Sequence, residues 1–424
     1  MGTQRVRTAI VGTGFMGRVH LEAVRRLGFA DVVAVVGSHV DKARAMADAF
    51  GVPHASADYR AALRDVDVDV VHVCTPNVQH YAMAAAALEA GTHVICEKPL
   101  AMSSAEAIDL VNRATARRVR HATCYNLRYY PMVQQMRRLC EAGELGDVLI
   151  AQGTYSQDWL LYDTDWNWRV DSSEAGSLRA MGDIGSHWCD MVEHVTGLRI
   201  TSLSADLATF HKTRKRPRGS VETFAGKLHR ASDSYEETAI DTEDFAAVLF
   251  HLDERARGAL TVSQVSAGCK NRLSIEIYGS RASVAWNQER PDELWMGRRD
   301  GPNAITVKDP ALMAAAAATY ADLPGGHSKA TTTPSSSCSG AFTRRCSIRR
   351  CRPTIHRSMT GCGRCVCSTR CARATNAADG SNWLPSLWSL RDRSPLAPAQ
   401  IFGYALQPVT RTLPSPARSE QGLS

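Results

Sequence analysis

The chain has 424 residues, which is long enough for two domains that each bury a core of their own. No apolar run approaches the roughly 20 residues that a membrane span requires, and the N-terminus lacks the apolar core of a secretory signal. We therefore expect a soluble, cytoplasmic protein with no membrane partner.

The formal charge of +7 is unevenly distributed along the chain. Residues 331–424 contain thirteen Arg, no Lys and three acidic residues, a charge of +10 that leaves −3 for the first 330 residues. A nucleic-acid partner inferred from the net charge would depend entirely on this stretch, and we expect none. The cysteines divide in the same way. Six are scattered before residue 330, which is typical of a reducing compartment, and seven crowd between Cys338 and Cys371.

The N-terminal stretch predicts a dinucleotide-binding turn. Residues 7–11 form an expected buried strand, and a glycine-rich turn opens a helix that ends near residue 28, before a strand at 31–36. In G-x-G-x-x-G the first Gly makes the turn, the second admits a pyrophosphate, and the third lets helix and strand pack closely. The anion then lies at the helix N-terminus, where free N–H groups favour it. The predicted cofactor residues here are Gly12, Thr13, Gly14, Phe15, Met16 and Gly17.

The end of the second strand normally distinguishes NAD from NADP. An acidic residue there binds the ribose 2′-OH of NAD, whereas a basic residue accommodates the 2′-phosphate of NADP. This sequence has Gly37, Ser38 and His39 at that place, with Asp41 and Lys42 nearby. We expect Ser38 and His39 to contact the cofactor, and both NAD and NADP stay open.

Strands and helices alternate as far as residue 125, which predicts βαβ units and a parallel sheet in a Rossmann domain over residues 1–125. An Ala-rich helix at 79–90 stops at Gly91, a typical C′ residue. Ser103 and Glu106 predict a capping box for a helix that ends near residue 117. The other expected strands are 68–73, 92–95 and 120–125, and the other expected helices are 42–50 and 58–63.

Lys98 follows the strand at 92–95, between Glu97 and Pro99. Because Pro fixes its own φ and pushes the preceding residue into an extended conformation, Lys98 should have a defined direction. Ligands of an open α/β sheet bind at the carboxyl ends of its strands, which is where Lys98 is expected. The alternative is a Lys on a solvated turn.

Residues 126–328 consist mainly of strand-like runs joined by loops, which predicts an α+β domain with an open, mainly antiparallel sheet. Helices are expected at 131–140 and 186–196. The charged stretch 211–230 has no apolar period and is expected to be a mobile loop. The expected strands are 148–155, 201–208, 242–251, 257–265, 272–278 and 282–286.

Asp183 and His187 are four residues apart, so they share one face if they open a helix. An acid and an imidazole near Lys98 form a set suited to proton transfer during oxidation of an alcohol. One alternative is an N-cap Asp with a His packed on Trp188. Another is a metal site that includes Asp190, but no second cluster with ligand spacing accompanies it, so we expect no metal.

Trp159, Trp166 and Trp168 fall within ten residues of a predicted loop, beside amide and carboxylate side chains. Flat apolar faces next to such groups suit a sugar ring, which has C–H faces and a fringe of hydroxyls. A packed corner between the two domains is the alternative.

In order and spacing, these motifs resemble the glucose–fructose oxidoreductase / inositol dehydrogenase (Gfo/Idh/MocA) family of NAD(P)-dependent oxidoreductases over roughly residues 5–328. The resemblance implies a Rossmann domain joined to an open-faced sheet, hydride transfer at a sugar or polyol carbon, and a homodimer or homotetramer formed through the sheet. The motifs that carry it are the turn from Gly12 to Gly17, Thr75-Pro76-Asn77 with His80, Glu97-Lys98-Pro99, and the pair Asp183 and His187.

The same resemblance implies roles for single residues. Lys98 and His187 would serve as acid/base groups, and Asp183 would orient them or the substrate. The stretch 153–159 is similar to members of the family that act on pyranoses. Further implied cofactor contacts are Thr75, Pro76, Asn77, His80, Glu97 and Lys98, and implied substrate contacts are Asn126, Gln157, Trp168 and Arg169.

The family pattern stops near residue 328, and residues 329–424 have no apolar period. Cys362, Cys365 and Cys367 hint at zinc, but no clean pair of C-x-x-C units accompanies them. We expect a disordered or aberrant tail that arises from a frameshift. If the codons from Lys329 onward are read one base out of frame, permitted codon choices encode an amphipathic helix like the one that the family has at this place. A genuine basic, disordered or metal-binding tail is the alternative. The alternative to a dehydrogenase is a protein that the tail has impaired. It would then bind a dinucleotide without turnover or be inactive.

Overall fold

The computed structural model describes residues 5–218, 234–327 and 339. These residues lie in one compact unit, Met1–Leu390, and the second unit, Arg391–Ser424, is outside the described residues. The expected aberrant tail is also outside them apart from Ser339, as are residues 219–230 of the expected mobile loop. Within the described ranges, no helix has both the length and the apolar character needed to cross a membrane.

The first sheet has six strands in the order β3-β2-β1-β4-β5-β6, and every neighbouring pair is parallel. This order confirms the predicted Rossmann arrangement, in which the sequence of strands reverses between β1 and β4. Ligands bind at that reversal because the loops after the two strands part there. The strands are β1 (Val6–Val11), β2 (Ala30–Val36), β3 (His54–Ser56), β4 (Val70–Val73), β5 (His93–Cys96) and β6 (His121–Thr123).

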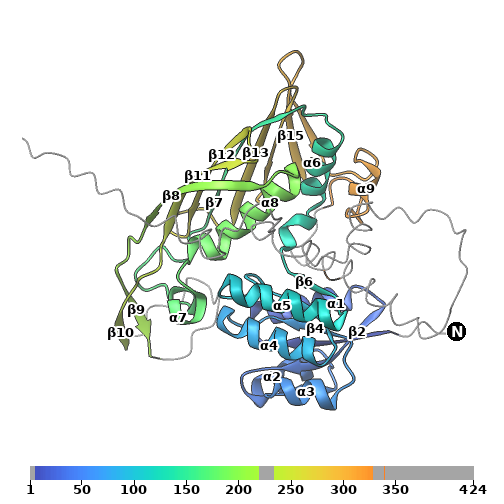
Figure 1. Ribbon diagram of the computed structural model, residues 1–424, viewed down its shortest axis with the longest axis vertical. Coiled ribbons are helices and arrows are strands. Elements are labelled where there is room, and N and C mark those ends of the chain that lie inside the picture. The colour runs from blue at the N-terminus through green and yellow to red at the C-terminus, as the bar shows by residue number, and fades with distance from the viewer. Residues whose placement is uncertain (1–4, 219–233, 328–338, 340–424) are drawn as a thin grey trace, which may run out of the picture. The chain divides into compact units, whose positions relative to one another are not determined.

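Helices cover both faces of this sheet, as Figure 1 shows for the lower half of the view. The helices α1 (Phe15–Arg25) and α2 (Val40–Ala49) pack on one face. On the other face lie α3 (Tyr59–Asp65), α4 (Asn77–Glu89) and α5 (Ser104–Arg117). Burial on both faces explains the nearly continuous apolar strands.

The capping of α5 follows the prediction only in part. Ser103 Oγ accepts a hydrogen bond from the backbone N–H of Glu106 at 3.3 Å, as a capping box requires. The Glu106 carboxylate, however, accepts from the backbone N–H of Met102 at 3.0 Å, one residue before the cap.

The second sheet has eight strands in the order β16-β15-β14-β13-β7-β12-β11-β8. Only the β7–β12 pair is parallel among these neighbours, which confirms the expected mainly antiparallel sheet. The short strands β15 and β16 were not expected. The strands are β7 (Val148–Ser156), β8 (Ile200–Ala208), β11 (Phe245–Leu252), β12 (Ala256–Ser263), β13 (Arg272–Gly279), β14 (Ser283–Asn287), β15 (Glu293–Gly297) and β16 (Ala304–Val307).

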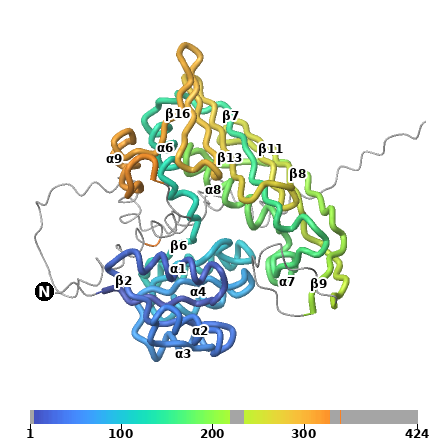
Figure 2. Tube along the Cα trace, turned by 180° about the vertical axis from the view of Figure 1, so that it is seen from behind, coloured from blue at the N-terminus to red at the C-terminus, as the bar shows by residue number. Residues whose placement is uncertain are grey.

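One face of this sheet carries the main core of the second half. Figure 1 shows α6 (Pro131–Glu141) and α8 (Ser186–Thr196) on that face, with the short helix α9 (Ala315–Ala318) beside α6. Trp188 of α8 is fully buried there, and its indole N–H donates to Ser274 O at 2.9 Å. Figure 2 presents the sheet from behind, where none of the described helices covers it.

The stretch expected to be a mobile loop contains a strand. The strands β9 (Thr213–Pro217) and β10 (Tyr235–Ala239) form a separate antiparallel pair. The expectation was wrong for residues 213–217 because the Arg214 side chain is buried against groups distant in sequence rather than solvated. Shorter elements before α8 are the 3₁₀ helices at Asn126–Tyr129 and Trp168–Val170, α7 (Ser172–Ala175), and a π-helical turn at Met181–Gly185.

Candidate active site

The glycine-rich turn between β1 and α1 has the shape of a pyrophosphate cradle. Gly12 has φ +114°, and a Cβ there would lie 2.5 Å from Cys74 O. A Cβ at Gly17 would lie 1.9 Å from Gly12 O, so helix and turn can pack this closely only without side chains. A Cβ at Gly14, in contrast, would meet no atom within 4 Å. The second Gly therefore leaves its side of the turn open, as an approaching phosphate requires.

The N-terminus of α1 is suited to an anion. Gly14 is its extended N-cap residue, no side chain caps it, and its first turn has no acidic residue. The free N–H groups and the helix dipole therefore face the open side of the turn without a competing carboxylate. Phe15 is 50% exposed at this end, Met16 packs partly against the core, and Thr13 is half-buried.

Ser38 and His39 lie exposed at the carboxyl end of β2, and His39 is the N-cap residue of α2. The position after β2 therefore offers a hydroxyl and an imidazole rather than an acid or an Arg. Both NAD and NADP remain compatible with it.

Side chains in the loop after β4 and in the start of α4 contact backbone carbonyls of neighbouring segments. The two ring nitrogens of buried His80 lie 2.6 Å from Pro99 O and 2.9 Å from Thr75 O. Burial lowers the pKa of His80, although both carbonyls favour its protonated form. Asn77 Nδ2 donates to Ala175 O at 2.8 Å, and Pro76 is the N-cap residue of α4. The His80 ring is thus engaged by the backbone and positions the turn that contains Lys98.

Glu97 points into the nucleotide half rather than toward solvent. Its carboxylate lies 2.9 Å from His20 Nε2 and accepts from the backbone N–H of Lys98 at 3.2 Å. Burial opposes ionisation, but the hydrogen bond and charge of His20 outweigh it and lower the pKa of Glu97 to about 2. His20, Glu97 and Cys124 bring possible ligand atoms within 4.8 Å of one another. The His20–Glu97 hydrogen bond already explains why these atoms are close together. We therefore interpret the group as a structural support for the turn that contains Lys98.

Lys98 meets Asp183 in a largely buried ion pair. Lys98 Nζ donates to Asp183 Oδ1 at 2.7 Å and to Asp183 O at 2.6 Å. Arg169 Nε also donates to Asp183 Oδ1, at 3.1 Å. Burial alone would raise the pKa of Asp183, but the charges of Lys98 and Arg169 hold it well below its usual range. Asp183 is therefore a permanent carboxylate, and the solvated-turn alternative for Lys98 does not hold.

His187 lies one turn further along the same helical path. The helix α8 begins at Ser186, and Asp183 lies in the preceding π-helical turn, so Asp183 is not its N-cap. The His187 ring contacts Tyr125 edge-on, with centroids 5.4 Å apart, rather than Trp188. Burial and the charge of Lys98 lower the pKa of His187 to about 3, so the ring is neutral at pH 7. His187 Nδ1 is buried and has no hydrogen-bond partner within the described part of the chain.

The predicted substrate residues lie at three places. Arg169 lies on Asp183 and stacks on Trp168, with its guanidinium carbon 4.4 Å from the ring centroid. Gln157 belongs to a neighbouring network, where it donates to Asn271 at 2.8 Å and accepts from the indole of Trp159 at 2.7 Å. Asn126 is half-buried at the start of the 3₁₀ helix that follows Tyr125.

The alternative of a metal site that includes Asp190 does not fit. Arg128 Nε donates to Asp190 Oδ2 at 2.6 Å, and Arg128 Nη2 pairs with Oδ1. Both carboxylate oxygens are therefore occupied by a guanidinium.

Sequence reasoning missed Gln264, which donates from Nε2 to Asp183 Oδ2 at 2.9 Å. It lies just after β12, 81 residues from Asp183, and no motif surrounds it. Tyr125, which contacts His187, was also missed. A Gln at the end of a strand has many ordinary roles, so its sequence position alone gave no signal.

Comparisons with known proteins agree with this geometry. Residues 6–125 match the family model described as "Oxidoreductase family, NAD-binding Rossmann fold", and residues 133–285 match the GFO/IDH/MocA C-terminal domain. The levoglucosan dehydrogenase of Pseudarthrobacter phenanthrenivorans is 30% identical over 300 residues, which cover 69% of this chain and 76% of that protein.

Two solved structures are similar over most of their length. A levoglucosan dehydrogenase in complex with NADH and L-sorbose superposes with a TM-score of 0.72 and 26% identity, over 81% of this chain and 90% of that one. An inositol dehydrogenase homologue from Azotobacter vinelandii in complex with NAD⁺ gives a TM-score of 0.70 and 25% identity, over 82% and 87%.

Proposed function

The chain belongs to the Gfo/Idh/MocA family of NAD(P)-dependent oxidoreductases, and we propose that it transfers hydride between nicotinamide and a hydroxyl-bearing carbon of a sugar or polyol, with Lys98, Asp183 and His187 as its reactive centre. The observation that carries the proposal is the buried Lys98–Asp183 pair beside neutral His187, since these groups adjoin the strand ends where a dinucleotide binds.

The residues of the turn from Gly12 to Gly17 fit a dinucleotide. The open side of Gly14 and the uncapped α1 N-terminus would hold its pyrophosphate. A bound nicotinamide supplies the hydride acceptor in the oxidative direction.

Each reactive side chain has a distinct proposed part in the proton transfer. Asp183 stays ionised and fixes the Lys98 ammonium through two acceptors, its carboxylate and its carbonyl. Lys98 then donates a further hydrogen bond to the substrate oxygen and stabilises the developing alkoxide. Neutral His187 accepts the hydroxyl proton. The Lys98 charge that lowers the pKa of His187 also favours loss of that proton, so a strong base is not required.

The aromatic loop supports a pyranose as the substrate. Arg169 donates to Asp183 and stacks on Trp168, which brings an apolar ring and a fixed cation close to the proposed proton-transfer groups. Such a pair suits the C–H face and hydroxyl fringe of a sugar. The levoglucosan dehydrogenase, to which this chain is 30% identical, supports the same class.

The first test is formation of NADH or NADPH with a panel of pyranoses and inositols. Replacing Lys98→Met should lower kcat/KM on the order of 10³-fold, the contribution of a positioned acid/base group, while NADH still binds. Lys215→Met is the matched control. Lys215 lies on β9, and its Nζ forms an ion pair with Asp163 Oδ2 at 3.0 Å, while 32% of the Lys215 side chain is exposed. Full activity in the Lys98 variant would refute the assignment, and a wild-type protein without turnover on every substrate would refute the function.

We also propose that the chain forms homo-oligomers through the uncovered face of the eight-stranded sheet. Apolar side chains are exposed on this face, and a mixed apolar and polar patch of this kind suits a partner surface. Its most exposed members are Ile150 (46%), Leu249 (66%), Ile305 (59%) and Val307 (49%).

Light scattering after size exclusion tests the oligomer. The wild-type protein should have a mass that is a multiple of the 46.2 kDa chain. Leu249→Glu should reduce that mass, because it introduces a charge into the apposed faces. Leu312→Glu is the control, since Leu312 is 63% exposed but lies outside the sheet. A wild-type monomer would contradict the proposal.

A further inference from the structure

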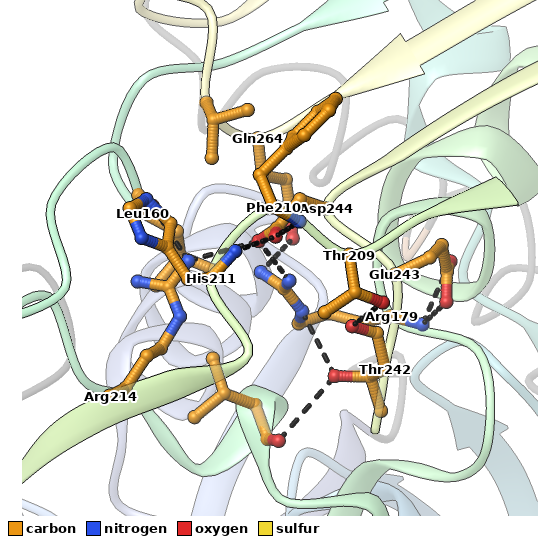
Figure 3. A network of polar contacts seen from close by, with 12 residues as sticks. Leu160, Arg179, Thr209, Phe210, His211, Arg214, Thr242, Glu243, Asp244 and Gln264 are labelled. Atoms are coloured by element: carbon orange, nitrogen blue, oxygen red, sulfur yellow. Dashed lines mark hydrogen bonds and ion pairs between the residues drawn. The ribbon is translucent and has the colours of Figure 1, made fainter. Parts of the chain in front are cut away.

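A buried charged cluster is joined to Asp183 through Gln264. Figure 3 shows Arg179 and Arg214 converging on one carboxylate, that of Asp244. The three side chains are fully buried, and Arg214 Nη2 donates to Asp244 Oδ1 at 2.9 Å. Two cations on one anion give the cluster a formal charge of +1.

Arg179 fixes the direction of the Gln264 amide. Arg179 Nη1 lies 3.4 Å from Gln264 Oε1, and Gln264 Nε2 lies 2.9 Å from Asp183 Oδ2. A guanidinium only donates and an ionised carboxylate only accepts. The reversed amide would oppose donor to donor and oxygen to oxygen at the two contacts, so Gln264 fits in one orientation only.

Gln264 therefore sets the plane of the catalytic carboxylate. Lys98 and Arg169 both donate to Asp183 Oδ1, and Gln264 donates to Oδ2. With Oδ2 held, the carboxylate cannot turn about its last bond, and Oδ1 stays directed at Lys98.

The same cluster also holds the substrate loop. Arg214 donates to the carbonyl oxygens of Tyr162 at 2.7 Å, Leu160 at 2.9 Å and Asp165 at 3.1 Å. These carbonyls lie in the segment that leads to Trp168 and Arg169. Asp244 Oδ2 completes the cluster by accepting from the backbone N–H groups of Phe210 at 2.7 Å and His211 at 3.1 Å.

We propose that Gln264 is a positioning residue for hydride transfer. It orients Asp183, and through Arg179, Asp244 and Arg214 it joins the reactive carboxylate to the loop that precedes Trp168. This inference rests on the proposed function, in which the Lys98–Asp183 pair is the reactive centre. Gln264 contacts Arg179 and Asp183, so its proposed effect on the reaction passes through Asp183.

The test uses two substitutions of Gln264 in the full chain. Gln264→Met keeps the length of the side chain but donates nothing, so kcat should fall about tenfold, the effect of one hydrogen bond to a charged group, with little change in the KM for the dinucleotide. Gln264→Glu can replace the amide while its carboxyl is protonated. The ratio of its kcat to that of the wild type should therefore fall as pH rises and the carboxyl ionises against Asp183. A loss that is equal at every pH would indicate a merely structural role and overturn the proposal.

Gln135→Met is the matched control, because Gln135 is also buried and accepts from Ala314 N at 2.8 Å, away from the reactive centre. This variant should lose stability without a change in the pH profile of kcat.

A second readout needs no turnover. Acetylation of Lys98 by acetic anhydride, located by peptide mass spectrometry, should be several-fold faster in Gln264→Met than in the wild type, with acetylation of Lys215 as the internal reference. Unchanged Lys98 reactivity and unchanged kcat together would refute the positioning role. Altered Lys98 reactivity in a chain that oxidises no sugar would refute the proposed function, and the contact by which Gln264 orients Asp183 would then have a structural role only.

Discussion

Asp183 receives side-chain hydrogen bonds from three separate parts of the chain. Lys98 follows β5, Arg169 lies in a 3₁₀ helix, and Gln264 follows β12. Three donors on one buried carboxylate keep it ionised, so it orients its neighbours instead of exchanging protons. His187, beside it, is held neutral by burial and by the Lys98 charge. In the proposed mechanism His187 therefore accepts the substrate proton, and the Lys98 ammonium stabilises the alkoxide.

At the residue scale, we predict an acid-sensitive stability that depends on His187. Its pKa is about 3 in the folded chain and about 6.5 in an unfolded chain. Between these values only the unfolded state binds the proton, so the free energy of unfolding should fall as pH drops from 6.5 to 3 and should not change through this group above 6.5.

Chemical denaturation at a series of pH values measures this effect. His187→Gln should flatten the slope by up to one proton across that window, because it removes the titrating ring. His39→Gln, at an exposed position, is the control and should leave the slope unchanged. An equal slope in the wild type and the His187 variant would mean that the folded-state pKa is not depressed.

The sequence predicted a site residue only where a motif surrounds it. Lys98, Asp183 and His187 were predicted because each lies in a recognisable string. Arg169 was expected to contact substrate, but it also holds Asp183. Gln264 could not be predicted, because its function arises from two contacts that only the folded chain brings together.

At the scale of elements, periodicity predicted the βαβ units well and failed at β9. The parallel strands are buried on both faces and therefore read as apolar runs. The β9 sequence, Thr-Arg-Lys-Arg-Pro, reads as a solvated loop. Arg214 nevertheless lies inside, because Asp244, 30 residues later, and three loop carbonyls satisfy its guanidinium. A local sequence pattern does not predict hydrogen-bond partners that are so far apart in the sequence.

At this scale we predict that Arg214→Lys destabilises the chain by about 3 kcal/mol, because an ammonium cannot reproduce the forked contacts of a buried guanidinium. Thermal and chemical denaturation measure the loss. Arg216→Lys on the same strand should change stability by no more than about 0.5 kcal/mol, since Arg216 is exposed. Equal effects in the two variants would show that the buried fork contributes little.

On the scale of the whole molecule, the two family models match residues 6–125 and 133–285, and the two solved structures cover 81% and 82% of this chain, whereas the Arg- and Cys-rich stretch has a different composition. We predict that a shift of one base near the codon for Lys329 gave rise to that stretch. Sequencing the source DNA across the codons for residues 329–404 tests this directly. A single-base difference should restore an amphipathic helix, and an unchanged frame would make the zinc content of the stretch the next measurement.

The Lys98–Asp183 pair has an evolutionary consequence. Lys98 lies in the stretch matched by one family model and Asp183 in the stretch matched by the other. A chimera assembled from two relatives would thus inherit half of the proposed reactive pair from each parent. Under the proposed function, the second half can change its substrate contacts and keep hydride transfer only if it still presents a carboxylate to the same lysine.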